Sequence, residues 1–103
     1  MAARRLLRGE NFDLHYGPVC AEGSVRLGLI VPKRLARTAS LRNAIKRQGR
    51  EAFRLMAVEI PPCDLILRLT RPVKGVMARD NEQRKGWRRE METLLRRLSV
   101  LPQ

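Results

Sequence analysis

Residues 25–58 read VRLGLIVPKRLARTASLRNAIKRQGREAFRLMAV, and this stretch decides the fold. Apolar residues occupy every second position at its start, which predicts a half-buried strand over Val25–Val31. Pro32 ends that strand, and Lys33 to Ser40 forms a basic loop. Apolar residues then recur at helical spacing, which predicts a helix from about Leu41 to Val58. The expected apolar stripe of this helix consists of Leu41, Ile45, Ala52 and Met56, with Phe53 at its edge.

Two positions in this helix carry further expectations. Ser40 is expected to be its N-cap, because a serine hydroxyl can accept a hydrogen bond from a free backbone amide of the first turn. Gly49 lies near the seam between the apolar stripe and the polar side. A missing side chain there would allow a neighbouring element to approach closely, at a cost of about 1 kcal/mol in helix propensity.

The segments on either side predict the remaining elements. Alternation predicts strands over Phe12–Tyr16 and Cys63–Thr70, and a short strand is expected over Val19–Ala21. A last helix is expected to begin near Asp80, because Asp80 and Gln83 resemble a capping box. Its expected apolar stripe consists of Trp87, Met91, Leu94, Leu95 and Leu98.

The order of these elements is βββαβα, which predicts an α+β fold built as a small two-layer α-β sandwich. A short basic N-terminal segment, residues 1–9, is expected to be frayed. Residues 10–100 are expected to form a single domain.

The charge of the chain points to a polyanionic partner. Lysine and arginine number 22 against 10 aspartate and glutamate, which gives a formal net charge of +12. Between Arg26 and Arg54, nine basic residues stand against one acid, Glu51. Arginine far outnumbers lysine, and because guanidinium groups bind phosphates bidentately and stack on bases, this bias favours nucleic acid.

Other classes of protein fit the sequence poorly. There is no apolar run of membrane-spanning length, and the N-terminus lacks the apolar core of a signal peptide, so we expect a cytoplasmic protein without a membrane partner. Cys20 and Cys63 are expected to be reduced thiols that act as small apolar residues. Asp13 and His15 are a weak candidate acid–base pair, for which a surface or capping role is favoured. We expect no catalytic residues, no metal ligands and no cofactor bound by the protein alone.

The first part of the predicted helix carries the most specific motif, Arg-Asn-Ala-Ile-Lys-Arg-Gln-Gly-Arg-Glu-Ala-Phe-Arg from Arg42 to Arg54. A solvated helix face normally mixes charges of both signs, whereas this one is almost purely cationic. We therefore expect it to follow an RNA phosphate backbone, with Asn43 offering a donor and an acceptor to ribose or base. The expected RNA-binding residues are Lys33, Arg34, Arg42, Asn43, Lys46, Arg47, Arg50 and Arg54.

Leu27 to Leu55, with this motif at its centre, resembles the bacterial ribonuclease P protein component. The strand Asp64–Leu67, the later Arg71-Pro72 and the last helix fit that family too. The resemblance implies a left-handed βαβ crossover, whereas strand physics alone would favour a right-handed one. It also implies a protein subunit that binds the catalytic RNA subunit and precursor tRNA, as a monomer in a 1:1 complex with the RNA. Phosphodiester cleavage and the required Mg²⁺ are expected to belong to the RNA.

The chain departs from the family pattern at three places. Ala44 stands where the motif usually has a second arginine, and Pro32 stands where serine is usual. The family normally begins with an amphipathic helix whose phenylalanines help to line a cleft for the substrate leader. Only the basic segment of nine residues precedes the expected domain here, so we expect leader binding to be weakened.

A substrate-leader cleft is expected at Tyr16, Arg26 and Arg68, because aromatic and cationic side chains on a sheet can bind single-stranded RNA. Core positions are nevertheless favoured for Phe12 and Tyr16, since both share a face with Leu14, and Tyr16, at the strand end, is the better cleft candidate of the two. A ribosomal or general RNA-binding protein of similar fold is the alternative function. A free-standing nuclease would need clustered carboxylates, which the sequence does not show.

Overall fold

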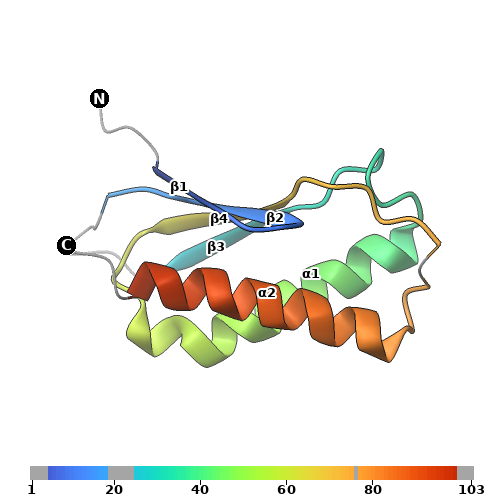
Figure 1. Cartoon of the computed structure of the whole chain (residues 1–103). Coiled ribbons are helices and arrows are strands. Elements are labelled where there is room, and N and C mark those ends of the chain that lie inside the picture. The colour runs from blue at the N-terminus through green and yellow to red at the C-terminus, as the bar shows by residue number, and fades with distance from the viewer. Residues whose placement is uncertain (1–4, 19–24, 76, 100–103) are drawn as a thin grey trace.

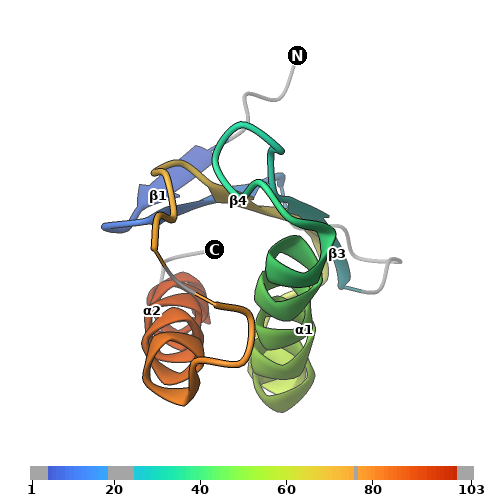
Figure 2. The same ribbon diagram turned by 90° about the vertical axis from the view of Figure 1, so that its right-hand side faces the viewer.

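The computed structural model describes residues 5–18, 25–75 and 77–99. Four strands form one sheet in the order β1-β2-β4-β3, from β1 (Arg5–Arg8), β2 (Phe12–Tyr16), β3 (Arg26–Ile30) and β4 (Asp64–Leu69). Two helices, α1 (Ala39–Met56) and α2 (Asn81–Ser99), lie side by side and cover one face of that sheet (Figures 1 and 2). A short 3-10 helix, η1 (Ala57–Glu59), follows α1. The two-layer α+β prediction is confirmed.

The crossover has the unusual hand that the family resemblance implies. Strand β1 pairs antiparallel with β2, and β2 with β4, whereas β3 and β4 are parallel and are joined through α1. Viewed from the helix side with β3 and β4 pointing upward, β4 lies to the left of β3 (Figures 1 and 2). The connection is therefore left-handed, against the strong general preference for right-handed crossovers.

Successive side chains of each strand point alternately to the side of the sheet that faces the helices and to the side that is open to solvent. Leu65, Leu67 and Leu69 of β4 are buried under the helices, and Phe12 and Leu14 of β2 lie opposite Leu69 and Leu67. The helices contribute the two predicted apolar stripes to the same core. Trp87 is 2% exposed and is among the largest side chains in it. Phe53 is only half-buried against this core, so its position at the edge of the stripe is confirmed.

Several local predictions need correction. Residues 1–9 were expected to be frayed, but Arg5–Arg8 forms the edge strand β1 and pairs with β2. Helix α1 begins earlier than predicted, and its N-cap is Thr38, whose hydroxyl accepts from the Leu41 amide at 3.1 Å, rather than Ser40. The predicted strand over Val19–Ala21 and Cys20 lie outside the described residues. Cys63 is buried as a free thiol.

Two side chains of α2 form hydrogen bonds with the described part of the N-terminal hairpin: Arg97 Nη1 donates to the Arg8 carbonyl oxygen at 3.1 Å, and the Glu90 carboxylate binds the turn. Glu90 accepts hydrogen bonds from the backbone amides of Asn11 and Phe12, both at 2.8 Å, and from Asn11 Nδ2 at 3.0 Å. Gly9 belongs to the same contact, since a Cβ atom there would lie 2.6 Å from Glu90 Oε2 and 2.8 Å from the Phe12 carbonyl oxygen. Within the described ranges, neither helix is long and apolar enough to span a bilayer.

Candidate nucleic-acid interface

The basic residues of α1 lie on the part of the helix that the sheet and α2 leave uncovered. Asn43, Arg47, Arg50 and Arg54 are exposed, and Lys46 is half-buried. Buried residues on the opposite side, from Leu41 to Met56, hold the helix in a fixed rotation. We call Asn43, Lys46, Arg47, Arg50 and Arg54 the basic arc. Because its side chains come from successive turns of a rigid helix, they can follow a phosphate backbone without first being ordered.

Arg42 has a different place from the one that its position in the motif suggested. Its Nη1 donates to the carbonyl oxygens of Ala36 and Arg37, at 2.9 and 3.0 Å. The side chain therefore holds the loop before α1 against the first turn of the helix. Its remaining N–H groups can still reach RNA, but its replacement would disturb the loop as well as remove a charge.

Arg54 is the member of the arc that is paired with an acid. Its guanidinium donates to both carboxylate oxygens of Glu51, one turn earlier on α1. This hydrogen bonding lowers the pKa of the Glu51 carboxyl, with a smaller contribution from the charge of Arg88 on α2, and it raises the pKa of Arg54. A phosphate would have to compete with Glu51 for Arg54, so Arg47 and Arg50 are the freer members of the arc.

A groove lies between α1 and the edge strand β3. Its volume is about 350 Å³, and it is lined by Leu27, Leu29, Phe53, Lys46 and Arg50. Gly49 permits the close approach, because a Cβ atom there would lie 2.6 Å from Leu29 Cδ2. The predicted role of Gly49 is confirmed. The groove is thus lined by apolar side chains and by two cations of the basic arc, Lys46 and Arg50.

The basic loop before α1 meets the loop that follows β4. The Val73 amide donates to the Leu35 carbonyl at 2.8 Å, which ties the two loops together. Arg34 and Arg37 line a hollow of about 680 Å³ there with Lys74. Lys33 is exposed on the same loop. The predicted pair Lys33 and Arg34 therefore lies near the N-terminal end of the basic arc, and Lys74 is a further cation that the sequence patterns did not single out.

The structure does not bring the three predicted cleft residues together. Arg26 and Arg68 point to the open side of the sheet, where Arg26 Nε lies 3.1 Å from Asp64 Oδ1 and Arg68 is exposed. Tyr16 belongs to the opposite, helix-facing side, because it pairs with Leu65 and packs against the core. Tyr16 lies two residues after Leu14, so the alternation of side chains along the strand already predicted that both face the helices.

Acidic residues do not converge anywhere in residues 5–18, 25–75 and 77–99. Asp13 and His15 share the open side of the sheet, where Asp13 lies opposite Arg8 and Arg68 in the two neighbouring strands. No group of three or more His, Cys, Asp or Glu side chains in these residues could hold a metal ion. The described part of the chain thus supplies no ligand set for magnesium.

One cationic cluster on α2 was missed by the sequence patterns, which used this helix only for its apolar stripe. Arg84, Lys85, Arg88 and Arg89 line a groove against α1 together with Gln48. Basic residues one turn apart on α2 were the available signal, but the acids that flank them, Glu82, Glu90 and Glu92, concealed it.

Comparisons with known proteins give one consistent result. The family model "Ribonuclease P" matches residues 1–99. The ribonuclease P protein component of Azoarcus sp. is 50% identical over 72 residues, covering 70% of this chain and 59% of the relative. That of Bordetella petrii is 45% identical over 73 residues, covering 67% and 59%. The chain thus spans about three fifths of the length of these curated relatives.

Comparison with solved structures gives the same family. The RNase P protein of Staphylococcus aureus superposes with a TM-score of 0.74 at 26% identity, covering 96% of this chain and 84% of that chain. The RNase P protein of Thermotoga maritima gives a TM-score of 0.67 at 27% identity, covering 96% and 87%. The motif on α1, the left-handed connection and these matches together show that the chain belongs to the ribonuclease P protein family.

Proposed function

We propose that this protein is the protein subunit of ribonuclease P, which binds the RNA subunit and assists removal of the 5′ leader from precursor tRNA. The basic arc on α1 is the observation that carries the proposal. It presents four cations and an asparagine on one uncovered helix surface, with only Arg54 paired to an acid among the described residues. The proposal places the protein in the cytoplasm, as one copy per RNA. Family membership favours it over a general RNA-binding role.

Cleavage itself is assigned to the RNA subunit in this proposal. The described residues lack the carboxylate cluster that two-metal phosphodiester chemistry needs, so the magnesium ions are assigned to the RNA as well. The protein then contributes positive charge and positioning. The open side of the sheet, with Arg26 and Arg68, is the surface proposed for the substrate leader. Asp64 competes with RNA for Arg26 there.

Reconstitution with a ribonuclease P RNA at different magnesium concentrations tests the proposal. Protein cations and magnesium ions neutralise the same phosphate repulsion, so the protein should raise cleavage of precursor tRNA strongly at low magnesium and less at high magnesium. Arg47→Ala with Arg50→Ala should remove most of the gain. These residues are preferred to Arg42, whose loss would disturb the loop.

A charge-matched double variant provides the control. Arg5 and Arg96 are exposed, and their side chains make no hydrogen bond or ion pair with the rest of the described chain. Arg5→Ala with Arg96→Ala should therefore retain the gain in cleavage. Equal cleavage with and without the protein at every magnesium concentration, with a folded sample and its matching RNA, would overturn the proposal.

A further inference from the structure

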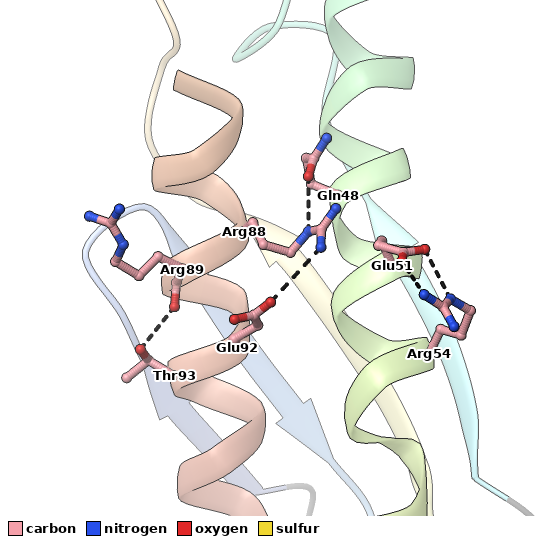
Figure 3. A network of polar contacts seen from close by, with 7 residues as sticks. All are labelled: Gln48, Glu51, Arg54, Arg88, Arg89, Glu92 and Thr93. Atoms are coloured by element: carbon pink, nitrogen blue, oxygen red, sulfur yellow. Dashed lines mark hydrogen bonds and ion pairs between the residues drawn. The ribbon is translucent and has the colours of Figure 1, made fainter. Parts of the chain in front are cut away.

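A second cationic surface lies in the groove between α1 and α2. It encloses about 380 Å³ and is lined by the basic residues Arg84, Lys85, Arg88 and Arg89, the amides Gln48 and Asn81, and one acid, Glu92. Figure 3 shows part of this groove, with Arg88 reaching from α2 toward Gln48 on α1 while the sheet lies behind both helices. Hydrogen-bond donors dominate the lining, so the groove suits an anion.

Arg88 is held in place before any ligand arrives. Its Nε donates to Gln48 Oε1 at 2.9 Å, and its Nη1 lies 4.0 Å from Glu92 Oε2 (Figure 3). Gln48 is only 8% exposed, and the Arg88 side chain is 29% exposed, so both are fixed by the helix contact. A guanidinium that is already oriented loses less conformational entropy when it binds a phosphate.

Neighbouring residues extend the positive surface along α2. Arg84 is held by its own hydrogen bond, from Nε to the Ala78 carbonyl at 2.8 Å. Arg84 and Arg88 are one turn apart, a rise of about 6 Å along the helix. Among the described residues, Lys85 has one ion pair, a 3.9 Å contact with the exposed Glu82, which water and salt screen. A row of cations with this spacing fits a chain of phosphates better than a single small anion.

We propose that the α1–α2 groove binds the phosphate backbone of RNA, as a contact separate from the basic arc. This inference rests on the proposed function and adds a second surface to it. Lys46 and Arg50 lie on the β3 side of α1, whereas Gln48 lies on the α2 side. RNA that engages both surfaces would pass over the outward part of α1, where Asn43 and Arg47 are exposed.

Lys85→Ala with Arg89→Ala tests the groove with little risk to the fold. Both residues are exposed, and their side chains hold no other described element. Affinity is measured against salt in two arms, which distinguish the source of the phosphates. One arm uses a ribonuclease P RNA transcript alone, and the other uses precursor tRNA added to the assembled protein–RNA complex. Arg5→Ala with Arg96→Ala serves as the charge-matched control.

In at least one arm, the groove variant should bind more weakly than this control, and its slope of log affinity against log salt should fall by about two. The arm that responds identifies which RNA occupies the groove. Equality of groove variant and control in both arms overturns the inference. If Arg47→Ala with Arg50→Ala still weakens binding in that case, the proposed function stands alone. If those changes also have no effect, the electrostatic basis of the proposed function fails too.

Discussion

Replacement of Glu90 by alanine should destabilise the protein by about 2–4 kcal/mol, because it removes three charge-assisted hydrogen bonds that cannot all be replaced by water. The carboxylate accepts from two backbone amides and one side-chain amide of the β1–β2 turn. Net contributions of about 1.5–3 kcal/mol per bond to a charged group would give a larger sum, but bonds that share one carboxylate are not additive. Phe12 is 1% exposed, so its amide would be left poorly solvated.

Urea unfolding followed by tryptophan fluorescence measures this loss directly. Trp87 is the single tryptophan of the chain, is 2% exposed, and lies on α2 just before Glu90. Glu90→Gln keeps one acceptor oxygen and should lose less than Glu90→Ala. Glu82→Ala is the control, since that side chain is 91% exposed and its one ion pair with the described residues has a distance of 3.9 Å. Its unfolding free energy should change by no more than about 0.5 kcal/mol.

A double-mutant cycle with Gly9 sharpens the test. Gly9→Ala should itself destabilise, because the added Cβ would meet both the Glu90 carboxylate and the Phe12 carbonyl. If both changes break the same contact, their combined cost should be smaller than the sum of the single costs. An equal unfolding midpoint for Glu90→Ala and the Glu82→Ala control would refute the assignment of Glu90 as a residue that fastens the turn of the hairpin to α2.

Three further predictions concern RNA binding, packing and the buried thiol. For RNA binding, Arg47→Ala and Arg50→Ala should each reduce the slope of log affinity against log salt by about one, and an affinity insensitive to salt would contradict phosphate contact. Phe53→Ala should cost less than the about 3–5 kcal/mol typical of a fully buried phenylalanine, because Phe53 is only half-buried, and urea unfolding measures this. Burial, with a smaller contribution from Asp64, raises the pKa of the Cys63 thiol. Stability should therefore fall as the pH rises past the thiol's ordinary pKa of 9.0, because only the unfolded chain then ionises. In a Cys20→Ser background, Cys63 should react with an aromatic disulfide reagent mainly after unfolding, and fast reaction of the folded protein would contradict its burial.

The two apolar stripes of the helices and the alternation of the strands were predictable from sequence, because apolar residues recur there with the period of a helix or of a strand. Strand β1 was not predictable in this way. Its sequence, Arg-Leu-Leu-Arg, lacks alternation, and it lies at the edge of the sheet with three of four residues exposed. The Glu90 contact was missed for another reason. Its partners are 78 and 79 residues away in sequence, and a lone glutamate in a charged helix gives no local signal.

The candidate site shows the same division. The basic arc was predictable because one helix carries it almost without acids. The cations of the α1–α2 groove were not predictable, since Arg84 and Arg88 become neighbours of Gln48 only when α2 packs on α1. Arg42 belongs to the motif, yet its contacts with two loop carbonyls could not be foreseen, because they depend on the path of the loop before the helix.

The distribution of acids explains how so basic a chain folds and still binds an anion. Acids that contact cations in the described residues do so mostly at exposed positions, as in the pairs Arg26–Asp64 and Lys85–Glu82. Glu90 instead accepts hydrogen bonds from backbone amides and forms no ion pair with a cation of the described residues. The ten acids leave a net charge of +12, and this excess of positive charge repels itself in the folded state. Added salt screens that repulsion and should raise the unfolding free energy, whereas the same salt weakens phosphate binding. Opposite salt dependences of stability and RNA affinity follow from one set of arginines, and two dependences of the same sign would mean that different charges govern folding and binding.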